Sequence, residues 1–145
     1  MHKAIINLRD EWNEENMKSL IKAIIECFLK NDKNFEQNTY IKKKEKVSIE
    51  FDKKGYASCL PFKGTLSFGN RIFTHSYRLE STGYKRERKF IKKRCGNDKV
   101  KIFIWVVVHE YSHFFKNMMQ HTHEFYEFVD ENFVKLLWYI LETTE

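Results

Sequence analysis

Three stretches of the chain have the apolar pattern of helices. In residues 13–30 apolar residues recur every three or four positions, which predicts a helix that packs against a core. Residues 99–118 contain the unbroken apolar run 102–108. Its β-branched residues would also suit a strand, but no turn signal interrupts it before Asn117, which favours a helix. A third helix is predicted from Glu124 to about residue 141. Residues that commonly cap helices precede all three: Asn13, Asp98 and Thr122.

Between residues 47 and 79 the pattern changes, because apolar and polar residues begin to alternate. A period of two is typical of strands with one buried face. It predicts strands at residues 47–51, 56–60, 71–79 and, more weakly, 62–68. Short turns, such as the one expected at residues 52–55, link these segments, so the sheet is expected to be mainly antiparallel. The remaining segments are predicted to be an exposed connection, residues 35–45, and a loop or short helix, residues 80–97.

The order of these elements predicts an α+β fold with an N-terminal helix, a small mainly antiparallel sheet of three to four strands, and two further helices. With 42% hydrophobic and 16% aromatic residues, the 145-residue chain is expected to form a single domain, residues 1–145. No apolar run reaches the roughly 20 residues that span a bilayer, and the N-terminus lacks a signal-peptide core. The three cysteines form no CxxC motif, which favours a reducing cytoplasm.

Basic residues are concentrated in the first two thirds of the chain. Residues 1–98 contain 22 Lys and Arg against 13 Asp and Glu, whereas residues 99–145 contain 4 against 7, and the two parts sum to the net charge of +6. The densest basic stretch comprises Lys85, Arg86, Arg88, Lys89, Lys92, Lys93 and Arg94. Such side chains neutralise phosphates, and Tyr84 or Phe90 can stack on unpaired bases, so the stretch predicts binding to nucleic acid, DNA included. A solvated lysine-rich surface is the alternative.

The chemistry suggested by the sequence centres on HEYSH at residues 109–113, which fits the pattern HExxH. Two histidines four residues apart lie on the same face of a helix, so the imidazoles of His109 and His113 can bind one Zn²⁺. Glu110 then stands beside the metal as an acid/base for water. The motif also arises by chance, but here it follows an apolar run typical of a buried helix, where histidines need polar partners.

A zinc site of this kind needs a third protein ligand beyond the helix. His121 and His123 follow the motif closely, and either can supply it. A carboxylate can fill the same position in related zinc peptidases, and the candidates here are Glu124, Glu127 and Asp130. His75 lies on a predicted strand, where a lone histidine is more often hydrogen-bonded than bound to metal.

This part of the chain resembles the SprT and WLM families of zinc metallopeptidases, in which HExxH is followed by a short connector and a motif HxxxFW or HxxxFY. The matching residues are those of HEYSH, then His121 with Phe125 and Tyr126, then the acidic pair Asp130 and Glu131. The resemblance covers roughly residues 100–133. It implies a zincin-like core with Glu110 as the catalytic acid/base and three zinc ligands: His109, His113 and His121. It also implies protein substrates associated with DNA.

Together these features predict a zinc metallopeptidase that hydrolyses a protein or peptide, with Tyr111, Tyr126 or His75 as a donor to the oxyanion. Two other functions stay open. One is a basic nucleic-acid-binding protein with a structural or degenerate metal site, and the other is a regulatory peptidase that cleaves a repressor. No membrane partner is expected, and the sequence leaves the oligomeric state open.

Overall fold

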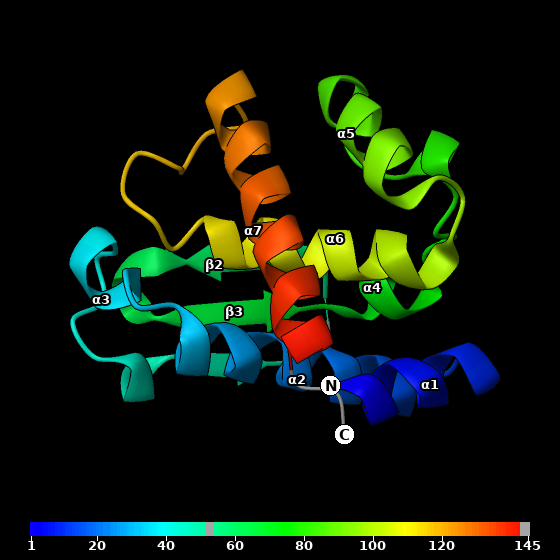
Figure 1. The fold of residues 1–145 in the computed structure, drawn as a ribbon, viewed down its shortest axis with the longest axis horizontal. Coiled ribbons are helices and arrows are strands. Elements are labelled where there is room, and N and C mark those ends of the chain that lie inside the picture. The colour runs from blue at the N-terminus through cyan, green and yellow to red at the C-terminus, as the bar shows by residue number, and fades with distance from the viewer. Residues whose placement is uncertain (52–53, 143–145) are drawn as a thin grey trace.

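Helix α6 (Lys99–Ser112), which carries the HExxH motif, runs through the middle of the molecule (Figure 1). The computed structural model describes residues 1–51 and 54–142. Eleven of the fourteen residues of α6 are buried, and the helix contacts α1, α2, α5, α7 and strand β2. A helix that is apolar on nearly every side must be covered on every side, so α6 organises the elements around it.

The start of α6 agrees with the sequence, and its end does not. The carboxylate of Asp98 accepts hydrogen bonds from the backbone N–H groups of Val100 and Lys101 at 3.0 and 3.1 Å. The helix predicted to residue 118 ends at Ser112. The chain leaves the helical path after His113, where the side chains of Phe114 and Phe115 are buried against the ring of Phe35.

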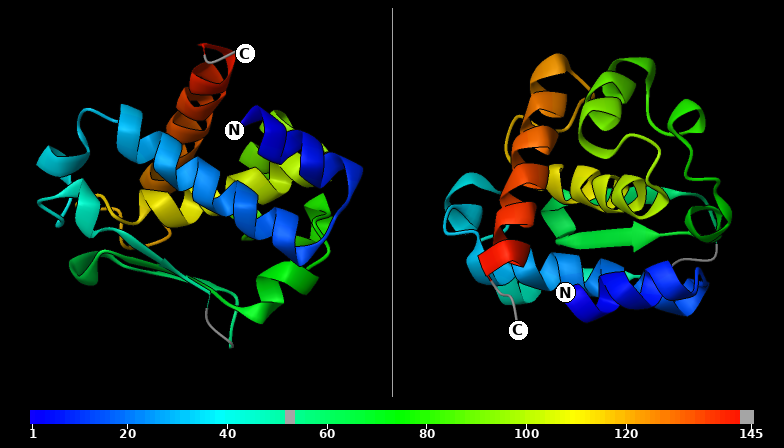
Figure 2. Two further views of the ribbon diagram at one scale, coloured as in Figure 1. Left: turned by 90° about the horizontal axis from the view of Figure 1, so that it is seen from below. Right: turned by 45° about the vertical axis from the view of Figure 1, so that its right-hand side comes forward.

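Two N-terminal helices cover α6 from below (Figure 2). α2 (Glu14–Asn31) confirms the first predicted helix, and the Asn13 side chain accepts a hydrogen bond from the Asn16 N–H at 2.8 Å. α1 (His2–Asp10) lies outside the predicted elements, and its buried residue is Leu8. The carboxylate of Asp98 also pairs with Arg9 at 3.1 Å, which ties α1 to the beginning of α6.

The sheet beside α6 is mixed. In the described part of the chain its strands are β1 (Ser48–Glu50), β2 (Ala57–Leu60) and β3 (Thr65–Phe68), in the order β1-β3-β2. β2 is antiparallel to β3 as expected, but β1 is parallel to β3, so the expected mainly antiparallel pairing describes half of this sheet. The weakest predicted strand is central because its apolar residues are the most buried. The turn expected at residues 52–55 lies partly outside the described residues.

The strand predicted at residues 71–79 is wrong. This region contains the short helix α4 (Asn70–Thr74) and, after an extended segment, the 3₁₀ turn η3 (Leu79–Ser81). Its buried residues are Ile72 and Tyr77, and the Tyr77 hydroxyl donates to the Ile72 carbonyl at 2.6 Å. Residues five apart do not share a face of a strand, so the chain bends to bury both, and packing overrides β-propensity.

Two further helices complete the fold: α5 lies above α6 in Figure 1, and α7 crosses in front of α6 and reaches α2. α5 (Lys85–Cys95) forms where a loop or short helix is predicted, and its buried residues Glu87, Ile91 and Cys95 are spaced by four. α7 (His123–Glu142) agrees with the last predicted helix, and Thr122 caps it by accepting a hydrogen bond from a backbone N–H at 3.2 Å. None of the helices in the described part of the chain is both long and apolar enough to cross a membrane.

The connection predicted to be exposed, residues 35–45, instead packs partly into the core. It contains α3 (Phe35–Asn38) and leads into the 3₁₀ turn η1 (Lys44–Lys46), while a third such turn, η2 (Pro61–Lys63), follows β2. Thr39 forms a β-bridge with Phe115, and the Lys116 N–H donates to the Asn38 carbonyl at 2.8 Å. These contacts fix the direction in which the chain leaves the HExxH motif. The α+β class and the order of helices and sheet are confirmed.

Candidate metal centre

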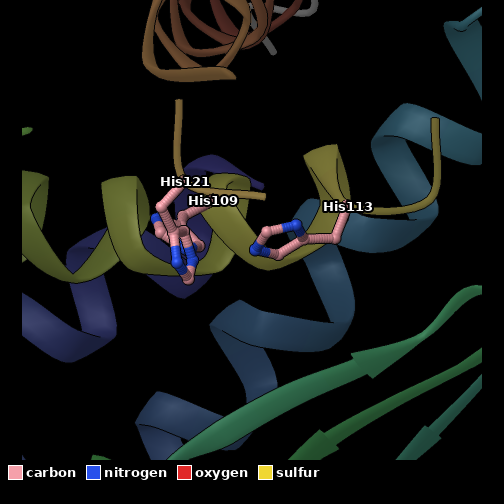
Figure 3. A group of neighbouring side chains, drawn as sticks. All are labelled: His109, His113 and His121. Atoms are coloured by element: carbon pink, nitrogen blue, oxygen red, sulfur yellow. The ribbon is translucent and has the colours of Figure 1, made fainter. Parts of the chain in front are cut away.

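Three histidines from two parts of the chain meet on one side of α6. His109 and His113 lie one turn apart near the end of the helix, and His121 belongs to the segment that leads to α7. Figure 3 shows the three imidazoles pointing toward one another. One nitrogen from each ring can be chosen so that all three lie within 4.8 Å of one another, and the Nε2 atoms of His109 and His121 are 3.1 Å apart.

The connector between α6 and α7 has the shape needed to return His121 to the helix. Asn117 adopts a left-handed conformation with φ 65°, which Asn tolerates better than most residues. The carbonyl of Met118 bonds to Nδ1 of His113 at 2.8 Å. The ring of Phe125 stacks on His113 with centroids 4.3 Å apart and lies 5.6 Å from His121, so an aromatic floor supports both imidazoles.

Hydrogen bonds to the outer nitrogens orient two of these rings. A carbonyl oxygen only accepts, so Nδ1 of His113 carries the proton that is donated to Met118 and its Nε2 has a free lone pair. Nδ1 of His109 likewise bonds to Glu87 Oε2 at 2.6 Å. Nitrogens that share a tetrahedral zinc at about 2.0–2.1 Å are themselves roughly 3.3 Å apart. The distance of 3.1 Å between Nε2 of His109 and Nε2 of His121 is close to this value. Two nitrogen lone pairs approach so closely when a proton or a cation lies between them.

The electrostatics of the cluster favour neutral imidazoles at two positions. Burial and the neighbouring His109 lower the pKa of His113 to about 4, and the same two causes lower the pKa of His121. Burial also acts to lower the pKa of His109, but the hydrogen bond and charge of Glu87 outweigh it and raise that pKa. Neutral imidazole is the form that binds metals, so His113 and His121 are ready ligands at neutral pH.

Glu110 lies beside the three histidines. It is 9% exposed, and its Oε1 is 4.0 Å from His109 Nε2. Burial, aided by the negative charge of Glu87, raises the pKa of Glu110 against the opposing effect of His109. A carboxyl group whose pKa is raised toward neutrality is suited to accept and return a proton.

Two cavities meet at Glu110. The larger, about 380 Å³, is bordered by His109, Glu110 and His121 together with Tyr56 just before β2, His75 at the end of α4 and Tyr84 just before α5. The smaller, about 170 Å³, is bordered by Glu110, His113 and residues 57–59 of β2. Among the described strands, β2 pairs with β3, and its other edge has no partner strand. Both cavities are bordered by Ala57 of β2 and by Glu110, so they follow this outer edge on either side of Glu110.

Other residues proposed from the sequence are engaged elsewhere. His123 bonds to Glu127 at 2.7 Å on the surface of α7, so it does not join the cluster, and Glu124 is exposed. Asp130 pairs with Arg94 at 2.7 Å. Of the described His, Cys, Asp and Glu residues, those brought together for a metal ion are the three histidines.

The candidate oxyanion donors also lie in different places. Tyr111 points away from the cluster and donates from its hydroxyl to Asp32 at 2.6 Å. His75 borders the larger cavity and bonds through Nε2 to the Thr82 hydroxyl at 3.0 Å, which agrees with a hydrogen-bonded histidine near the cleft. The ring of Tyr126 is nearly parallel to that of His121, with centroids 6.3 Å apart.

Two residues at this site, Glu87 and Trp105, are not among the predicted site residues. Glu87 is the one acid within the basic stretch and is 2% exposed; it accepts hydrogen bonds from Trp105 and His109. A signal existed, because Glu87, Ile91 and Cys95 recur every four residues and so mark the inner face of α5.

The basic stretch is divided between the two faces of α5. Arg94 binds Asp130 on α7, and Arg88 donates to the Thr82 carbonyl at 3.3 Å. Five side chains of the stretch are exposed: Lys85, Arg86, Lys89, Lys92 and Lys93. They follow Tyr84, which borders the larger cavity and packs on His121 with ring centroids 4.6 Å apart.

Fold and site together define a small α+β domain with a three-histidine candidate metal centre next to a buried glutamate. Comparison with known proteins adds no relative, since no protein-family model, no curated protein and no solved structure gives a significant match to this chain.

Proposed function

We propose that this protein is a zinc-dependent peptidase of the kind found in the SprT and WLM families. The observation that supports it is the cluster of three imidazoles beside the Glu110 carboxylate, at the point where two cavities meet. His109, His113 and His121 would hold the zinc, and three nitrogen ligands suit a catalytic site because they leave a position open. When bound, zinc lowers the pKa of water to about 7 and polarises a carbonyl group.

The residues of the chain would divide the remaining work. Glu110 takes the proton of the attacking water at its carboxylate and returns it to the leaving amine. The outer edge of β2 offers backbone groups to an extended peptide, which would add to the sheet as a strand. A peptide bound along this edge passes both cavities and presents its backbone to Glu110.

The test uses purified protein with its zinc content measured. The protein is incubated with an unstructured protein as substrate, and Glu110→Gln is compared with wild type. We expect Glu110→Gln to bind zinc and to cleave at least ~100-fold more slowly, the usual contribution of a general base. Glu124→Gln, an exposed glutamate of α7, is the matched control and should behave as wild type. Equal cleavage by wild type and Glu110→Gln would end the proposal.

The exposed basic face of α5 supports DNA-associated proteins as the substrates and, as a second candidate function, nucleic-acid binding without proteolysis. The inner residues of the same helix, Glu87 and Ile91, border the larger cavity, so a polyanion bound to the exposed face of α5 would be kept near the site. We place the protein in the cytoplasm in the same proposal, because all three cysteines are free thiols.

Binding to single-stranded DNA at several salt concentrations tests the role of this face. The variant carries Ala at Lys85, Lys89, Lys92 and Lys93. A matched control removes four exposed lysines elsewhere, namely Lys33, Lys42, Lys43 and Lys46. Each phosphate contact contributes about −0.7 to the slope of log affinity against log salt for single strands, so the α5 variant should bind with a shallower slope. Equal losses in both variants would show that the attraction is non-specific, and DNA binding without cleavage would favour the second function.

A further inference from the structure

The most deeply buried acid near the metal centre is Glu87, which the proposed catalysis does not use. It lies on the first turn of α5 and is 2% exposed. One oxygen, Oε2, accepts hydrogen bonds from the indole N–H of Trp105 at 2.9 Å and from Nδ1 of His109 at 2.6 Å. The other, Oε1, faces the backbone N–H of Tyr84 at 3.4 Å.

The backbone before α5 makes room for this carboxylate. Gly83 has φ 74°, and a Cβ atom there would stand 2.8 Å from Glu87 Oε1 and 3.0 Å from the Ile91 side chain. A residue with a side chain would therefore displace the glutamate as well as strain the turn. The turn, the indole and the first turn of α5 together hold the carboxylate against the far side of His109.

A buried carboxylate needs a positive partner, and the described ion pair of Glu87 is with His109 rather than with a basic residue of its own helix. The exposed lysines and arginine of α5 lie on the opposite face. An imidazole that binds a cation through Nε2 has a polarised Nδ1–H and is the partner that this carboxylate requires.

We propose that Glu87 is a positioning residue of the metal centre: it fixes the tautomer and orientation of His109 so that Nε2 faces the metal, and it ties the basic helix α5 to that ligand. The inference rests on the proposed metal site and not on proteolysis. It predicts that removal of the negative charge weakens metal binding by ~10–100-fold, the range for the outer partners of metal ligands.

The experiment measures zinc affinity by chelator competition and the imidazole tautomer by nitrogen NMR on full-length protein. Glu87→Gln keeps the size of the side chain and loses its charge, and Glu26→Gln makes the same change at an exposed glutamate of α2. We expect Glu87→Gln to bind zinc ~10–100-fold more weakly and to lose the single Nδ1–H tautomer of His109. Glu26→Gln, the matched control, should keep the affinity within about threefold, because it removes the same charge from an exposed side chain of α2.

The outcomes separate this inference from the proposed function. Zinc affinity and a His109 tautomer that are unchanged in Glu87→Gln would overturn the inference. An equal loss of affinity in Glu26→Gln would also overturn it, because the loss would then follow from net charge and not from the carboxylate beside His109. A wild-type protein that binds no zinc would overturn both proposals. Weaker zinc binding by Glu87→Gln in a protein that cleaves nothing would support the role of Glu87 while the peptidase proposal fails.

Discussion

Tyr111, the third residue of HExxH, is predicted to stabilise the fold and to have no part in the chemistry. Its hydroxyl donates to the buried carboxylate of Asp32 at 2.6 Å, and its ring stacks on Phe28 with centroids 4.1 Å apart. Burial raises the pKa of Tyr111 well above its ordinary value, so the hydroxyl remains a donor. Tyr111→Phe keeps the ring and removes the hydrogen bond, and the carboxylate keeps one backbone partner, the Asn34 N–H at 3.1 Å.

The expected loss follows from these contacts. A hydrogen bond to a charged group contributes about 1.5–3 kcal/mol. At about 2–4 °C per kcal/mol for a domain of this size, the melting temperature should fall by roughly 3–12 °C. Urea unfolding gives the free energy, and zinc titration of the folded variant gives the affinity, which should match wild type.

A second tyrosine provides the control for this prediction. Tyr139 donates to the neutral carbonyl of Asn31 at the longer distance of 3.4 Å, so Tyr139→Phe should cost less than about 1 kcal/mol. If Tyr111→Phe were as stable as wild type but bound zinc more weakly, the assignment of Tyr111 to the core would be refuted.

Three further predictions concern the helix that carries the motif. Asp98→Ala should lower stability by about 1 kcal/mol through loss of the α6 cap. Burial would raise the pKa of Asp98, but its bonds to Arg9 and to backbone N–H groups hold that pKa below its ordinary value. Its contribution is therefore complete above a pH of about 4 and is lost as the pH falls further, which urea unfolding at several pH values would show. Ser112→Ala should cost about 1–3 kcal/mol in urea unfolding, because the buried Asn132 amide donates to that hydroxyl at 3.0 Å. Zinc at a hundredfold excess over Kd should add about 2.7 kcal/mol to stability, and thermal melts should show that EDTA removes it.

Each of these has a result that would count against it. Asp98→Asn keeps an oxygen for the cap, so a loss as large as that of Asp98→Ala would point to the Arg9 pair instead. An unchanged Ser112→Ala variant would mean that the Asn132 amide finds another partner. A melting temperature that changes neither with added zinc nor with EDTA would argue against the metal site.

The parts of the fold that follow from local pattern could be predicted. α2 and α7 have apolar stripes and capping residues that leave few other choices, and the Asp98 cap marks the start of α6. The parallel pairing of β1 with β3 could not be predicted, because it depends on which strand is most buried and not on the turns between strands. The same holds for residues 71–79, where the spacing of Ile72 and Tyr77 in the core decides the path.

The residues of the candidate site likewise include some that the sequence predicts and some that it does not. Helical geometry places His109, Glu110 and His113, so the sequence alone predicts them. The choice of His121 over His123 depends on the hydrogen bond between His123 and Glu127, which is formed only once α7 begins at His123. Glu87 could not be linked to His109 from the sequence, since the two are brought together by the packing of α5 on α6.

The five residues of HExxH show how one helix serves two purposes. His109, Glu110 and His113 border the cavities, while Tyr111 and Ser112 face inward and bond to Asp32 and to Asn132. These inward contacts join α6 to the end of α2 and to α7, the two helices that fix its rotation. A rotation of α6 by one residue, 100°, would break both inward hydrogen bonds and move His109 and His113 from their present directions, so the buried hydrogen bonds of the inward pair also hold the imidazoles toward the cavities.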